Sequence, residues 1–189
     1  VTGALATGSR RRLAWACALT ARWTFEMGRR WTRRDFLKVG AAAVVGGAFS
    51  TRATDSPLRV ERLDLEVSGL DPAHDGLRVA QLSDFHVGSL TPPELVRESI
   101  AIANAFSPDL TVLTGDFLSR ERGGVGLLRE QITGIASPAV AVLGNHDHSV
   151  DPAGAASVLM SLGYAVLRNE NTTISIGGAP LTIVGIDDH

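Results

Sequence analysis

Apolar residues follow two different spacings along most of the chain, and these spacings predict strands and helices in turn. Short apolar runs, or apolar residues at every second position, predict strands. The predicted strands cover residues 60–67, 77–82, 110–113, 139–143, 165–167, 172–176 and 181–184. Helical spacing predicts helices over residues 91–106, 126–135 and 153–162. Strands that alternate with helices are typical of a layered α/β domain.

Local signals predict how some of these elements begin, end or pack. Thr91 stands before two prolines, with Glu94 three residues later, so we expect Thr91 to cap the following helix. Apolar groups on alternate positions of residues 60–67 predict a half-buried strand. Gly177 and Gly178 predict a turn between the last two strands.

The charge of the chain changes sign after its first part. Residues 1–38 contain nine Arg and Lys and two acidic residues, whereas the remainder contains nine Arg and 18 Asp and Glu. The remainder shows no basic stripe that could neutralise phosphates, which argues against nucleic-acid binding. Apolar residues make up 44% of the chain, which is normal for a globular protein with a buried core. A targeting segment followed by a globular domain is therefore predicted.

The basic segment contains a motif that is typical of export. Arg33 and Arg34 are followed by Phe36-Leu37-Lys38 and then by the weakly apolar run 39–49. This arrangement resembles a twin-arginine signal peptide. The run is short and rich in Gly and Ala, whereas a transmembrane helix needs about 20 strongly apolar residues. Small residues within positions 48–53 offer cleavage sites, and an uncleaved leader would leave the protein associated with the membrane.

These features divide the chain into three parts. Met27 stands just before the leader, so residues 1–26 are interpreted as an upstream extension and residues 27–53 as the twin-arginine signal peptide. Residues 54–189 then form the folded domain, and residues 1–53 are excluded from the predicted fold. The twin-arginine translocation machinery would be a partner, with the periplasm, the outer face of the cytoplasmic membrane or the cell wall as destination.

Three polar clusters directly follow three of the predicted strands. They are Asp84-Phe85-His86, Gly115-Asp116 and Gly144-Asn145-His146-Asp147. Open α/β sheets bind ligands outside the carboxyl ends of their strands, so these loops can converge on one site. Carboxylate, imidazole and amide ligands without a thiolate suit Mn, Fe or Zn.

Each cluster taken alone has an ordinary structural explanation. Asp116 could end a strand, His86 could be a surface histidine, and residues 145–147 could form a turn. Their joint occurrence after three strands favours a metal site instead.

The order and spacing of the clusters resemble the calcineurin-like metallophosphoesterase family. Its pattern is D-x-H, then G-D, then G-N-H-D/E, then a lone His and G-H-x-H, and roughly residues 77–189 carry the first three motifs in order. The resemblance implies a layered α/β fold, a β-sandwich flanked by helices. The last two motifs are absent, so the domain is expected to be truncated at its C-terminus. The layout also resembles the branch with a twin-arginine leader and, more loosely, lipid-A-precursor pyrophosphatases.

The resemblance also implies a role for each matching residue. Two divalent metal ions are expected, the first bound by Asp84 and His86, the second by Asn145, with Asp116 bridging both. His146 would contact the substrate phosphate and assist the leaving group. Asp147 would orient the His146 imidazole, as carboxylates commonly do.

The implied activity is hydrolysis of phosphate esters or pyrophosphate bonds, with lipid- or cell-envelope-linked phosphates among the candidate substrates. Two cations about 3.5–4 Å apart can share a hydroxide nucleophile and hold a phosphoryl group for in-line displacement. Without the last histidines, the fragment itself is expected to be inactive. One alternative is a non-catalytic, degenerate metal-binding module at the cell surface. Another is a cytoplasmic phosphoesterase whose leader is an artefact of start-site choice.

The remaining histidines and the final acidic residues receive weaker interpretations. His74 lies beside acidic residues and is expected to be solvated, and His148 is a candidate for the rim of the site. His189 is interpreted as a chance match to the lone ligand histidine. Asp187 and Asp188 follow the last predicted strand without an assigned role.

Overall fold

The computed structural model describes residues 10–19, 58–88, 91–120 and 124–188. The proposed twin-arginine signal peptide, the remainder of the proposed upstream extension and His189 lie outside these described residues. Among the helices of the described residues, none has the length and apolar character needed to cross a membrane.

The main sheet has six strands in the order β2-β1-β3-β4-β5-β6. Their bounds are β1 (Arg10–Leu19), β2 (Arg59–Ser68), β3 (Leu77–Ser83), β4 (Leu110–Thr114), β5 (Ala139–Val142) and β6 (Ala165–Val166). β1 and β2 are antiparallel, and every other neighbouring pair is parallel. β7 (Glu170–Ile176) and β8 (Ala179–Gly185) form a separate antiparallel hairpin, and the predicted turn at Gly177 and Gly178 is confirmed.

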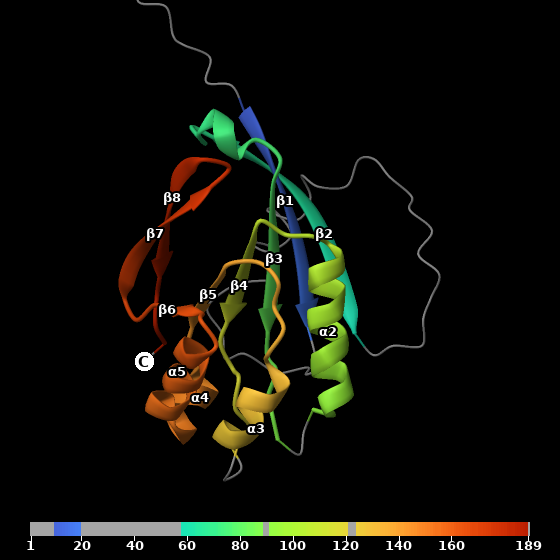
Figure 1. Ribbon diagram of the computed structural model, residues 1–189, viewed down its shortest axis with the longest axis vertical. Coiled ribbons are helices and arrows are strands. Elements are labelled where there is room, and N and C mark those ends of the chain that lie inside the picture. Colours follow the sequence, from blue (N-terminus) through green and yellow to red (C-terminus); the bar gives the residue numbers. More distant parts are fainter. Residues whose placement is uncertain (1–9, 20–57, 89–90, 121–123, 189) are drawn as a thin grey trace, which may run out of the picture. The chain divides into compact units, whose positions relative to one another are not determined.

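The elements pack in three layers, with helices on one face of the main sheet and the β7–β8 hairpin on the other (Figure 1). The helices are α2 (Pro93–Ala105), α3 (Gly124–Gln131), α4 (Asn145–Val150) and α5 (Pro152–Ser161). Successive side chains of a strand point to opposite faces. In β3, Ala80 and Leu82 therefore pack with the helices, while Leu77 and Val79 pack toward the hairpin. The predicted layered α/β architecture is confirmed.

The structure adds a strand, β1, in a region that the sequence analysis excluded from the fold. β1 lies between β2 and β3, with Trp15 opposite Leu63 on one side and Val79 on the other. The indole Nε1 of Trp15 donates a hydrogen bond to Gln81 Oε1 at 3.1 Å. Residues 10–19 show no clear period, and their strand conformation depends on partners far away in sequence. Excluding residues 10–19 was therefore wrong.

Three local predictions also need correction. α2 begins after Pro92 without a side-chain cap, while Thr91 is buried and pairs with Val87 instead. β2 lies at the edge of the sheet, and Leu63 and Leu65 are 41% and 42% exposed, so this strand has no buried face. In addition, α3 ends at Gln131 rather than near residue 135.

Candidate metal centre

The loops that follow β3 and β4 run side by side at the carboxyl edge of the sheet. Asp84 N donates to Gly115 O at 3.2 Å, and His86 N donates to Asp116 O at 2.9 Å. These bonds extend the parallel pairing of β3 with β4 beyond the strands themselves. The first two polar clusters of the sequence therefore meet, as expected for neighbouring parallel strands.

Three of the predicted metal ligands have a left-handed backbone conformation. The φ angles are 58° at Asp84, 42° at His86 and 57° at Asp116. Such angles are uncommon in residues other than glycine, and they gather at functional sites when the surrounding structure holds them. The three side chains lie close together: His86 Nε2 lies 3.7 Å from Asp84 Oδ1 and 3.8 Å from Asp116 Oδ2.

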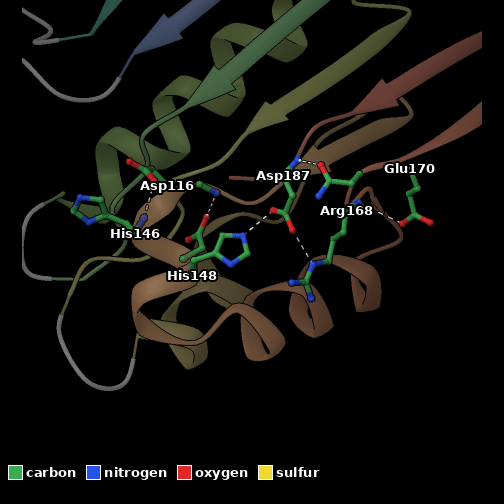
Figure 2. Close-up of polar contacts among 9 residues, drawn as sticks. Asp116, His146, His148, Arg168, Glu170 and Asp187 are labelled. Atoms are coloured by element: carbon green, nitrogen blue, oxygen red, sulfur yellow. Dashed lines mark hydrogen bonds and ion pairs between the residues drawn. The ribbon is translucent and has the colours of Figure 1, made fainter. Parts of the chain in front are cut away.

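The third cluster reaches the same place from the end of β5. Asn145 begins α4 and lines a cavity of about 340 Å³ together with Asp84 and Asp116. His146 N donates to Asp116 Oδ1 at 3.1 Å (Figure 2). The ring centroids of His86 and His146 are 4.5 Å apart. One ligand atom from each of His86, Asp116 and His146 lies within 4.8 Å of the others. The structure thus places His146 among potential ligands, whereas the sequence analysis gave it a catalytic role.

The electrostatics and the donor set fit a divalent cation. The contact with His86 lowers the pKa of Asp84 against the effect of burial, and the contact with Asp84 raises the pKa of His86. The carboxylates of Asp84 and Asp116 both face His86 Nε2, at distances too long for hydrogen bonds. All three groups are of the types that bind a cation such as Mn, Fe or Zn, and binding of the cation would displace the imidazole proton.

Asp147 does not orient His146, and this prediction is wrong in the structure. Its carboxylate is fully buried and accepts Leu118 N–H at Oδ1 and Gly144 N–H at Oδ2, both at 2.9 Å. Burial raises the pKa of Asp147, and these two donors oppose that shift. Within the described residues, His146 Nδ1 is buried without a hydrogen-bond partner. Asp147 instead caps α4 and ties it to the loop after β4.

Gly115 and Gly144, which precede Asp116 and Asn145 in their motifs, stand where a side chain would clash with neighbouring backbone. A Cβ at Gly144 would lie 2.2 Å from Asp116 Oδ1 and 2.6 Å from Asp116 N. Gly115 has φ 84°, and its Cβ would lie 2.5 Å from Gly144 N. The backbones of the G-D and G-N-H-D motifs therefore approach each other so closely that neither position has room for a side chain.

Gly144→Ala should destabilise the protein by at least about 2 kcal/mol, because the new methyl group meets backbone that cannot move aside. Gly126→Ala is the matched control. Gly126 lies in α3 with open space around its Cβ, so this change should stabilise the helix by roughly 0.5–1 kcal/mol. Urea unfolding of both variants tests the prediction, and an unchanged free energy of unfolding in Gly144→Ala would contradict the close approach.

The other histidines differ in their surroundings. His74 is 2% exposed and its Nε2 lies 3.2 Å from Ile176 O, so the expectation of a solvated side chain is wrong. His148 lies in α4, and its Nε2 is 2.7 Å from Asp187 Oδ1. Asp187, to which the sequence analysis gave no role, lines the same cavity as Asn145.

Comparison with known proteins places this site in a family. Residues 77–183 match the calcineurin-like phosphoesterase family. The metallophosphoesterase YkuE of Bacillus subtilis, itself uncharacterized, is 28% identical over 173 residues, covering 83% of this chain and 60% of YkuE. An uncharacterized metallophosphoesterase of Aquifex aeolicus is 30% identical over 148 residues, covering 77% of this chain and 55% of the relative. The UDP-2,3-diacylglucosamine pyrophosphatase LpxG of Chlamydia muridarum is 30% identical over 112 residues, covering 58% of this chain and 34% of LpxG.

The chain thus spans 60% or less of the length of these relatives. No solved structure matches it significantly. The family match covers more than half of the chain and includes all three polar clusters that meet at the carboxyl edge of the sheet. The chain belongs to the calcineurin-like metallophosphoesterase family.

Proposed function

We propose that the protein is a hydrolase that uses two divalent metal ions to cleave phosphate esters or pyrophosphate bonds. The observation that carries this proposal is the convergence of Asp84, His86 and Asp116 at the ends of neighbouring parallel strands, each with a positive φ angle. Asp84, His86 and Asp116 would hold the first ion, and Asp116 and Asn145 the second. When bound, such ions lower the pKa of water and neutralise charge on a phosphoryl group.

The positions of the two Asp116 oxygens support a bridging role. Oδ2 faces His86, while Oδ1 accepts the His146 N–H on the side of α4. One carboxylate therefore contacts both halves of the site. The His146 ring lies against the His86 ring, close enough to the carboxylates to meet a phosphoryl group held there. In this proposal His146 transfers a proton to the leaving oxygen.

The proposed substrates are phosphorylated compounds, with lipid- or cell-envelope-linked diphosphates as the first candidates. This choice is supported by the name of one relative, a UDP-2,3-diacylglucosamine pyrophosphatase. The polar cavity of about 340 Å³ beside Asp84, Asp116 and Asn145 is open enough to admit a phosphoryl group. The proposed metal site acts on the phosphoryl group whatever the leaving group is, so phosphate esters are also proposed as substrates.

Hydrolysis by the whole protein tests this function. The protein is stripped of metal, reloaded separately with Mn²⁺, Fe²⁺ or Zn²⁺, and assayed with p-nitrophenyl phosphate, its diester and a nucleoside-diphosphate sugar. We expect metal-dependent release of phosphate or of a phosphomonoester from at least one substrate. Tight metal binding without any turnover would instead support a non-catalytic metal-binding module.

We further propose export by the twin-arginine route, supported by Arg33 and Arg34 ahead of a weakly apolar run. Changing both residues to Lys should leave the protein in the cytoplasm, because the paired arginines form the recognition signal. Cell fractionation with an immunoblot measures this, and a variant with Arg29 and Arg30 changed to Lys serves as the matched control. Undiminished export of the Arg33/Arg34 variant would eliminate this route.

A further inference from the structure

Asp187, which follows β8, joins three segments of the chain through polar contacts (Figure 2). Its Oδ1 lies 2.7 Å from His148 Nε2 in α4, and its Oδ2 accepts a hydrogen bond from Arg168 Nε at 3.0 Å. Its N–H donates to Asn169 Oδ1, also at 3.0 Å. The side chain of Asp187 is only 6% exposed. These contacts tie α4 to the end of β8 and to the loop between β6 and β7.

The contact between Asp187 and His148 holds α4, the helix that carries the third polar cluster. His148 lies three residues after Asn145, and residues with this spacing share one face of a helix. Asn145 and Asp187 also line the same cavity, together with Asp84 and Asp116. Asp187 therefore holds α4 on the side from which Asn145 reaches the metal centre.

α4 needs such a support because it is short. It has six residues, so few of its backbone groups are bonded within the helix. Asp147 fixes its beginning through Gly144 and Leu118. The His148–Asp187 contact fixes the next turn. Burial acts to raise the pKa of Asp187, but the bonds to His148 and Arg168 lower it overall. The carboxylate is therefore ionised, and its bonds to these two residues are charge-assisted.

We propose that Asp187 is a positioning residue of the metal centre, which sets the orientation of α4 through His148 and so places Asn145 beside Asp116. Arg168 binds Asp187 Oδ2 and thereby keeps Asp187 Oδ1 directed toward His148. This inference rests on the proposed function, because it takes Asn145 as a metal ligand. It gives Asp187 the role of orienting a ligand-bearing helix rather than the role of a metal ligand.

Calorimetric titration of the metal-free whole protein with Mn²⁺ tests this role. Asp187→Asn should weaken Mn²⁺ binding about 10-fold or more, the usual effect of removing a group that orients a ligand. His148→Gln should weaken Mn²⁺ binding to a similar extent. The double variant should bind Mn²⁺ as tightly as the single variant with the lower affinity, because both changes break the same contact between His148 and Asp187. Asp109→Asn is the matched control, since Asp109 Oδ2 accepts Arg78 N–H at 2.8 Å before β4, at the opposite end of that strand.

The outcomes separate positioning from general stability. If Asp187→Asn and His148→Gln only lower the melting temperature, as Asp109→Asn does, and bind Mn²⁺ like the parent, the proposal is overturned. It is also overturned if the effects of Asp187→Asn and His148→Gln on Mn²⁺ affinity are fully additive. Weakened, non-additive Mn²⁺ binding supports the proposal even if the parent hydrolyses no phosphate ester, in which case only the proposed function fails.

Discussion

Asp116→Asn in the whole protein should lower metal content and hydrolysis together, with hydrolysis falling by roughly 100-fold or more. The change keeps one side-chain oxygen, which can still accept the His146 N–H that Asp116 Oδ1 accepts at 3.1 Å. It removes the negative charge that faces His86 and that is proposed to lie between two cations. Without that charge, the mutual repulsion of the cations is less compensated.

Elemental analysis of the purified variant beside steady-state kinetics measures both effects. Asp151→Asn is a suitable control, because Asp151 Oδ1 accepts Gly154 N–H at 2.8 Å at the start of α5 and does not line the cavity. The control should retain the metal content and the activity of the parent. Full metal content in Asp116→Asn would show that this carboxylate is not a bridging ligand.

His146→Gln should reduce hydrolysis by roughly 100-fold or more while metal content stays near that of the parent. Glutamine cannot transfer a proton as imidazole does. The loss should be larger for substrates with poor leaving groups, which need the proton most, than for nitrophenyl esters. The backbone N–H of residue 146, which donates to Asp116, is unaffected by the substitution.

The same metal analysis decides between the two roles that are open to His146. A ring nitrogen of His146 lies within 4.8 Å of the ligand atoms of His86 and Asp116, so His146 is near enough to coordinate the same metal ion. If His146→Gln loses metal as Asp116→Asn does, His146 is a ligand and the proposed division of roles is wrong. A uniform loss across good and poor leaving groups, with metal retained, would contradict proton transfer.

Much of the architecture that carries the site was predictable from local patterns. β3, β4 and β5 each end within one residue of the predicted strand, because apolar runs that are bounded by polar and turn residues leave few alternatives. The convergence of Asp84, His86 and Asp116 followed from the geometry of parallel strands, whose carboxyl ends share an edge. The family resemblance added the roles of these residues, which periodicity alone does not contain.

Some features escaped prediction because they depend on contacts between residues far apart in sequence. β1 has no clear period of its own, and its place between β2 and β3 comes from pairing with both. His74 looked solvated among acidic neighbours, yet it is buried against Ile176, 102 residues later. Sequence patterns report the local preference of a segment, whereas its partners are chosen by the packing of the whole sheet.

Local patterns in the amino-acid sequence were enough to predict the α/β class, the positions along the chain of the strands that carry the site, and the residue types that can bind a divalent cation. The neighbour of each polar group, by contrast, follows from the folding of distant segments onto one another. The Asp147 carboxylate bonds two backbone N–H groups rather than the His146 ring, and Asp187 reaches His148 across 39 residues of sequence. A charged side chain can form a hydrogen bond with any complementary group within about 3 Å, and residues far apart in sequence come that close only when the chain is folded.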